Sequence, residues 1–97
     1  FNFLAIVFAT LKEGDRKAVS AFEEAVEEIP QIVLAQRLFG DPDYLMHVVT
    51  RDLPAFQKLY DEKLSAMPGV QHLRSTLVMK TVVQDRPFPL DISGRDE

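Results

Sequence analysis

The segment Gly40-Asp41-Pro42-Asp43-Tyr44 lies between two apolar runs, residues 32–39 and 44–50, and it decides how the chain is interpreted. Glycine and proline favour turn geometry, and an aspartate can accept hydrogen bonds from backbone amides of its own turn. The flanking runs are rich in the β-branched and aromatic residues that suit strands. The pattern therefore predicts a β-hairpin that carries two carboxylates and a tyrosine at its tip.

Length and composition limit the possible classes of protein. The 97 residues suit one small domain with a thin core, and a hydrophobic content of 46% is typical of a folded chain. The absence of cysteine excludes disulfides and thiolate metal sites and favours a reducing, cytoplasmic location. No run is long enough for a membrane helix, and the net charge of −4 argues against nucleic-acid binding by this chain alone. Because the sequence opens on an apolar run at Phe1 rather than on a methionine, we expect a domain of a longer protein.

Two segments have the apolar spacing of amphipathic helices and lie between strand-like runs. The first covers residues 15–28 and the second residues 52–67, each with an aspartate as N-cap and a proline after its end. The strand-like runs cover residues 1–10, 32–39, 44–50 and 70–83. This order, with right-handed crossovers, predicts an α+β, ferredoxin-like βαββαβ domain, in which a four-stranded antiparallel sheet carries two helices on one face.

Both faces of the predicted sheet are apolar. Apolar residues alternate on the two sides of three strands: Phe1, Phe3, Ala5 and Val7 against Leu4, Ile6 and Phe8; Ile32, Leu34 and Leu38 against Val33, Ala35 and Phe39; Leu73, Leu77 and Met79 against Val78 and Val82. The helices can cover only one face, and monomers rarely expose a large apolar patch. We therefore expect the domain to dimerise through its sheet.

No residue pattern in the sequence supports catalysis. The two histidines, His47 and His72, lack metal-ligand spacing, the serines lack a nucleophile-elbow context, and the four glycines are too scattered to cradle a phosphate. Asp41 and Asp43 could form an acid–base pair, but carboxylates at a solvated tip lack the burial that suits one of them to proton transfer. We expect a domain that is not an enzyme and carries no cofactor or metal.

Four segments, in this order, resemble the C-terminal (RAM) domain of the Lrp/AsnC, or feast/famine, transcription regulators. They are Gly40-Asp41-Pro42-Asp43-Tyr44-Leu45, Met67-Pro68-Gly69-Val70, Ser75-Thr76-Leu77-Val78-Met79 and Arg86-Pro87-Phe88-Pro89-Leu90. The resemblance covers residues 1–90 and leaves residues 91–97 as a C-terminal tail. It implies a module that senses an amino acid, pairs sheet to sheet into dimers and assembles further, commonly into octamers. DNA would be bound only by an N-terminal helix-turn-helix domain that is not in this chain.

The resemblance also implies an effector site between subunits. The positions that match it are Gly40, Asp41, Asp43, Tyr44, Leu53, Ser75, Thr76, Leu77 and Val78. A carboxylate in the turn can accept from an α-ammonium group, and turn amides can donate to an α-carboxylate. Leu73 departs from the family, because many members have Thr-x-Thr ending at the position of Ser75. This leucine changes which amino acid fits, removes the competence of the site, or simply belongs to the core. The apolar Leu53, Leu73 and Leu77 favour an effector with an aliphatic or aromatic side chain.

Two other classes share parts of this pattern. One is a stand-alone RAM-type or ACT-like domain that binds amino acids, and the other is a dimeric, ferredoxin-like, cofactor-free monooxygenase. The monooxygenase would need a buried polar cluster inside the sheet, for which His47 is the only candidate. The G-D-x-D-Y hairpin followed by P-G-V favours the regulator over both.

Overall fold

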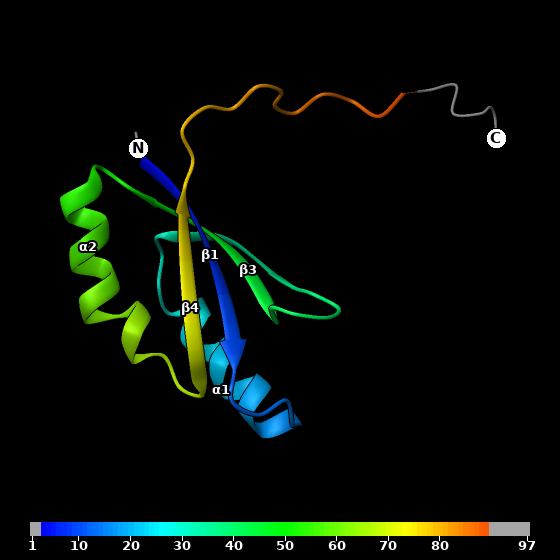
Figure 1. The fold of residues 1–97 in the computed structure, drawn as a ribbon, viewed down its shortest axis with the longest axis vertical. Helices are drawn as coiled ribbons and strands as arrows, with labels where there is room; N and C mark the ends of the chain where they lie inside the picture. The colour runs from blue at the N-terminus through cyan, green and yellow to red at the C-terminus, as the bar shows by residue number, and fades with distance from the viewer. Residues whose placement is uncertain (1–2, 90–97) are drawn as a thin grey trace.

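The computed structural model describes residues 3–89, and it shows a four-stranded sheet with two helices on one face (Figure 1). The elements are β1 (Phe3–Leu11), α1 (Arg16–Glu27), β2 (Ile32–Arg37), β3 (Tyr44–Thr50), α2 (Leu53–Glu62), a 3₁₀ turn η1 (Leu64–Ala66) and β4 (Val70–Leu77). The strand order is β2-β3-β1-β4, and each neighbouring pair is antiparallel. The predicted ferredoxin-like fold is therefore confirmed. Residues 1–2 and 90–97, which include Phe1, Leu90 and the predicted tail, lie outside the described residues.

Local signals start both helices at the predicted places. The Asp15 carboxylate accepts from the Ala18 amide at 2.8 Å, and the Asp52 carboxylate accepts from the Ala55 amide at 2.9 Å. The predicted end of the second helix at residue 67 is wrong, because α2 ends at Glu62 and a 3₁₀ turn follows. Leu64 and Met67 are still buried, so the apolar spacing predicted burial correctly although the helix is interrupted.

Two strands are shorter than predicted. β2 ends at Arg37 rather than at residue 39, and β4 ends at Leu77 rather than at residue 83. The last described backbone bond between β1 and the residues after β4 runs from the Val78 amide to the Leu4 carbonyl, at 3.0 Å.

The register of β2 also differs from the prediction. Ile32 pairs with Val48 and faces the helices, whereas Leu34 pairs with His47 and faces the other side. The prediction that Ile32 and Leu34 share a face is therefore wrong. The pairing shifts between these two residues, and such an irregularity reverses the alternation and leaves Val33 59% exposed.

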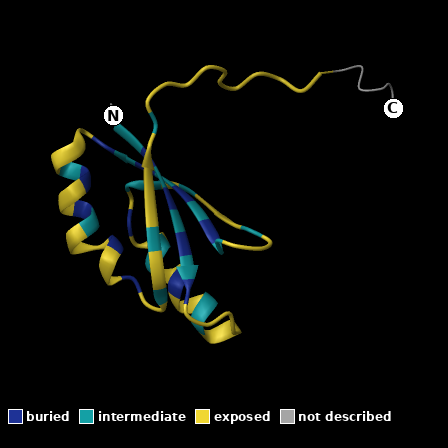
Figure 2. Cartoon of the chain, viewed as in Figure 1, coloured by how far each residue is buried: buried dark blue, intermediate teal, exposed yellow. Residues whose placement is uncertain are grey.

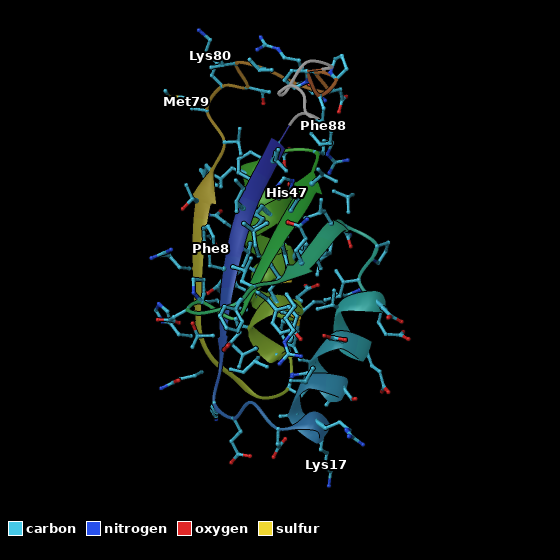
Figure 3. All side chains as sticks on the ribbon, turned by 90° about the vertical axis from the view of Figure 1, so that its right-hand side faces the viewer. Phe8, Lys17, His47, Met79, Lys80 and Phe88 are labelled. Atoms are coloured by element: carbon cyan, nitrogen blue, oxygen red, sulfur yellow. The ribbon has the colours of Figure 1, made fainter. Side chains whose placement is uncertain are left out.

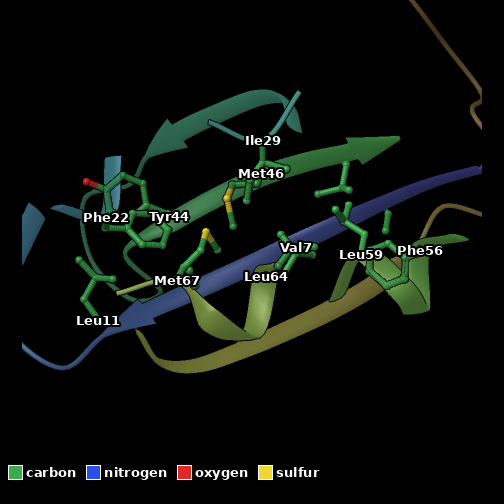
Figure 4. Close-up of a cluster of buried hydrophobic side chains, with 13 residues drawn as sticks. Val7, Leu11, Phe22, Ile29, Tyr44, Met46, Phe56, Leu59, Leu64 and Met67 are labelled. Atoms are coloured by element: carbon green, nitrogen blue, oxygen red, sulfur yellow. The ribbon is translucent and has the colours of Figure 1, made fainter. Parts of the chain in front are cut away.

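The core lies between the helices and one face of the sheet (Figures 2 and 4). Along β1 and β3 every second residue is buried, which shows that one face of each strand is packed. The largest side chains that are fully buried come from all layers of the fold: Phe22, Met46, Leu64, Val7 and Val48. The Phe22 ring packs against Tyr44 at a centroid distance of 4.7 Å.

The opposite face of the sheet, which we call the open face, carries no helix (Figure 3). Its centre is formed by alternate residues of β1 and β3: Leu4, Ile6, Phe8, Leu45, His47 and Val49. These side chains are only half-buried by one another and by β4, where Arg74 lies over the Phe8 ring at 4.8 Å. The predicted apolar character of both faces is thus confirmed for β1, and coverage of the open face by a second copy stays a prediction.

Candidate functional site

Asp43 is part of the fold rather than a solvated tip. Its carboxylate accepts from the Leu11 amide at 2.8 Å, its own amide donates to the Ala9 carbonyl at 3.0 Å, and its carbonyl accepts from the Leu38 amide at 2.8 Å. The first two bonds attach the β2–β3 connection to the end of β1, and the third lies within the connection itself. The expectation of two solvated carboxylates is therefore wrong for Asp43 and right for Asp41, which is exposed.

Gly40 gives the connection its shape. Its φ of +119° lies in a region that residues with a side chain rarely adopt. A glycine is thus required here for a conformational reason, independently of any ligand.

Tyr44 points to the helix side of the sheet. It is 3% exposed, and its hydroxyl donates to the Glu23 carboxylate. Burial, together with the neighbouring Glu23, raises the pKa of Tyr44 to about 12. Tyr44 borders a hollow of about 270 Å³ between α1 and β2, which Glu23, Val26, Glu27, Ala35 and Arg37 also line.

The raised pKa of Tyr44 predicts a loss of stability in alkali. Tyrosine in the unfolded chain loses its proton near pH 10, whereas Tyr44 in the folded chain keeps it until about pH 12. Its contribution is therefore fully present below pH 10 and is lost as the pH rises through about 12. We expect Tyr44→Phe to lose less unfolding free energy than the parent between about pH 9 and about pH 11.5 in urea titrations. Tyr60→Phe is the matched control, and equal slopes for Tyr44→Phe and the parent would contradict the prediction.

A second hollow, of about 200 Å³, lies beside the hairpin on the open face. Phe8, Thr10, Asp41, Pro42, His72 and Arg74 line it, and we call it the Asp41 hollow. Asp41 and Arg74 border the same space without forming an ion pair, since the one ion pair within 4 Å in residues 3–89 joins Arg51 and Asp52. A small zwitterion has one group for each of these side chains, an ammonium for Asp41 and a carboxylate for Arg74.

The predicted site residues fall into two groups in the structure. Gly40, Asp41 and Asp43 lie at the end of β1, whereas residues 75–78 lie beside the part of β1 from its middle to its start, and Leu53 lies near its start. Tyr44 pairs with Ala9 and Leu77 pairs with Ala5, which are four residues apart, or about 13 Å at ~3.3 Å per residue. Within one chain the hairpin does not meet Leu77 or Val78, so a site that contains both needs two chains.

The faces of β4 divide the second group further. Ser75 and Leu77 pair with buried residues of β1 and lie on the helix side, whereas Thr76 pairs with Ile6 on the open face. Leu73 lies on the helix side and packs against the core, which supports the core interpretation of this departure from the family pattern.

The sequence did not indicate four of the residues around the Asp41 hollow: Phe8, Thr10, His72 and Arg74. His72 and Arg74 alternate along β4 and so share a face, which was a usable signal. The pairing of these residues with Thr10 and Phe8 depends on the register between β1 and β4, which no local pattern specifies.

The described residues contain no metal centre and no spanning helix. Within residues 3–89 no three histidine, aspartate or glutamate side chains gather in a way that could hold a metal ion. None of the helices in this part of the chain has the length and apolar sequence needed to cross a membrane.

Comparisons with known proteins test the family resemblance that the sequence motifs suggested. A family model described as the Lrp/AsnC ligand binding domain matches residues 4–88. The Bkd operon transcriptional regulator of Pseudomonas aeruginosa is 31% identical over 84 residues, which cover 87% of this chain and 55% of that protein. The leucine-responsive regulatory protein of Escherichia coli is 34% identical over 83 residues, which cover 86% of this chain and 51% of that protein. The chain therefore spans about half the length of the curated relatives it matches.

Solved structures share the fold. A transcriptional regulator from Neisseria meningitidis, crystallised as a complex with L-Met, has a TM-score of 0.82 at 24% identity over 94% of this chain and 58% of that chain. AsnC of Escherichia coli has a TM-score of 0.81 at 16% identity over 92% of this chain and 58% of its own. The fold and the sequence matches agree, and the chain belongs to the Lrp/AsnC family of transcriptional regulators, corresponding over residues 4–88 to its ligand binding domain.

Proposed function

We propose that this domain senses a small amino acid and transmits its binding, through the state of assembly, to an N-terminal helix-turn-helix domain outside this chain. The observation that carries the proposal is the placement of Asp41 and Arg74 on the same hollow without an ion pair between them. A regulator of this kind would act in the cytoplasm.

The chemistry of the Asp41 hollow suits an α-amino acid. The Asp41 carboxylate can accept from the ammonium, and the Arg74 guanidinium can donate two parallel hydrogen bonds to the carboxylate. Hydrogen bonds to charged groups contribute roughly 1.5–3 kcal/mol each. The volume of about 200 Å³ suits a small molecule. The L-Met complex of the Neisseria regulator supports an amino acid as the class of effector.

A second chain is needed to complete the predicted site. Five of the predicted site residues are separated along the sheet from the hairpin of their own chain, so we assign them to a site with the hairpin of a neighbouring chain. They are Leu53, Ser75, Thr76, Leu77 and Val78. Asp43 keeps one carboxylate oxygen beyond the bond from Leu11 and stays in the proposed set. Gly40 and Tyr44 stay in it as residues that shape the hairpin, because Tyr44 is 3% exposed and bonds Glu23 on the helix side.

The dimer would form through the open face, whereas Ser75 and Leu77, which lie on the helix side of β4, would meet a neighbouring hairpin only when dimers assemble further. Two such faces packed against each other would remove Leu4, Ile6, Phe8 and Val49 from water, and this burial drives association. We propose that the resulting dimers assemble further, into octamers. The monooxygenase alternative finds no support, because His47 lies between Ile6 and Leu34 on the sheet and not in a polar cluster.

Calorimetric titration with the twenty amino acids tests the effector site. We expect at least one small amino acid to bind, and Asp41→Asn and Arg74→Gln each to weaken its binding about tenfold or more. Asp41 is exposed, so Asp41→Asn should leave the melting temperature unchanged. Asp61→Asn, which removes an exposed carboxylate on α2, is the control. If none of the twenty amino acids gives a heat of binding while the oligomer is intact, the domain serves assembly alone. If Asp41→Asn binds the amino acid as tightly as the parent, the site does not lie in this hollow.

A further inference from the structure

After β4 the chain leaves the body of the domain as an extended segment, residues 79–89, which we call the arm (Figures 1 and 2). The arm carries four exposed apolar side chains: Met79 (96% exposed), Val82 (83%), Val83 (52%) and Phe88 (88%). Pro87 and Pro89 favour an extended backbone near its end. A single exposed apolar residue is ordinary, but a row of four on a projecting segment indicates a surface that is buried in an assembly.

The alignment with the Neisseria structure reaches into the arm. It covers 94% of this chain, whereas the residues up to Leu77 make up only about four-fifths of the chain.

The chain also has an apolar groove that is suited to such a segment. The groove, of about 220 Å³, lies at the β2 edge of the sheet and is lined by Pro30, Gln31, Val33 and Val49. Val33 is open to solvent because of the irregularity in β2. The Oε1 atom of Gln31 is buried and has no hydrogen-bond donor within residues 3–89. An amide donor brought by an incoming backbone would satisfy this oxygen after rotation of the side-chain amide.

The length of the arm and the position of the groove allow exchange between two copies. The arm starts at β4 and the groove lies at β2, the opposite edge of the same end of the sheet, three strand spacings or about 14 Å away. At its root the arm borders the open face, because Val78 and Met79 share a hollow with Leu4 and Val49. Eleven extended residues span up to about 36 Å, which is enough to cross the end of a partner's sheet.

We propose that the arm of one chain docks in the Pro30–Val33–Val49 groove of a second copy, so that two arms are exchanged across the dimer. This inference rests on the dimer of open faces proposed above. The exchanged arms would stabilise the dimer that the two open faces form.

Engineered cysteines test the placement, since the native chain contains none. Chains with Phe88→Cys and chains with Val33→Cys are mixed and oxidised, and we expect a disulfide between the two kinds of chain. A disulfide requires Cα atoms within about 7 Å, so the cross-link reports contact of arm and groove. Phe88→Cys mixed with Lys58→Cys, an exposed position on α2, is the control and should not cross-link. Failure of the Val33 pair, or equal yield from the control pair, would overturn the proposed groove.

Measurements of dimer affinity distinguish the contribution of the arm from the contribution of the open face. The triple variant Met79→Ser/Val82→Ser/Phe88→Ser should dimerise about tenfold or more weakly in sedimentation equilibrium, because three apolar contacts are lost. Unchanged affinity of this variant, with the parent dimeric, would overturn the exchange of arms and leave the open-face dimer in place. A parent chain that is monomeric would instead overturn the dimer on which both proposals rest.

Discussion

Ile6→Lys is expected to convert the domain into a monomer. Ile6 lies at the centre of the open face, paired with His47 on β3 and with Thr76 on β4. An ammonium group placed there would be buried in the proposed interface without a partner, and the ionisable groups of this face that lie nearest to Ile6, His47 and Arg74, are both basic. The dimer dissociation constant should rise about a hundredfold or more, and light scattering at micromolar concentration measures it.

The matched control introduces the same charge where no partner is proposed. Gln57→Lys on the exposed side of α2 should leave the assembly intact. Because Ile6 is only half-buried in the isolated chain, Ile6→Lys should still fold, as far-ultraviolet circular dichroism can check. A variant that keeps the mass of the parent oligomer would show that the contact between copies lies elsewhere.

Asp43→Ala is expected to destabilise the domain by about 1–3 kcal/mol, because the Leu11 amide loses its acceptor. Leu11 is 7% exposed, so water cannot fully replace the carboxylate oxygen at 2.8 Å. This is a substantial share of the 5–15 kcal/mol that holds a small domain together. Urea denaturation measures the change.

Two further variants identify the cause of this destabilisation. Asp43→Asn keeps an oxygen for the Leu11 amide and should recover much of the stability, whereas Asp41→Ala, at an exposed side chain, should cost little. Equal losses for Asp41→Ala and Asp43→Ala would contradict the structural role of Asp43. The consequence for effector studies is practical: a loss of binding in Asp43→Ala reports folding as well as contact, so Asp41 and Arg74 are the better test positions.

The hairpin that the resemblance to Lrp/AsnC regulators indicated is present in the structure, and its residues have different tasks. Asp43 and Gly40 shape the connection, and Tyr44 serves the core through Phe22 and Glu23. Of the four hairpin residues predicted for the site, only Asp41 lines the hollow that we propose as the effector site. A motif records which residues a family keeps, and it does not separate those that hold the fold from those that touch a ligand.

The sequence by itself determined the features that depend on neighbours in the chain. The caps at Asp15 and Asp52, the apolar spacing that buries Phe22 and Phe56, and the turn at Gly40 all follow from interactions within a few residues. Together these local signals predicted the order of the helices and strands, and that order predicted the fold. The register shift in β2, the end of β4 at Leu77 and the meeting of Asp41 with Arg74 were decided only by the tertiary structure. The reason is physical: each of these depends on which residue of one strand lies opposite which residue of another, and that pairing is fixed by the packing of the whole sheet.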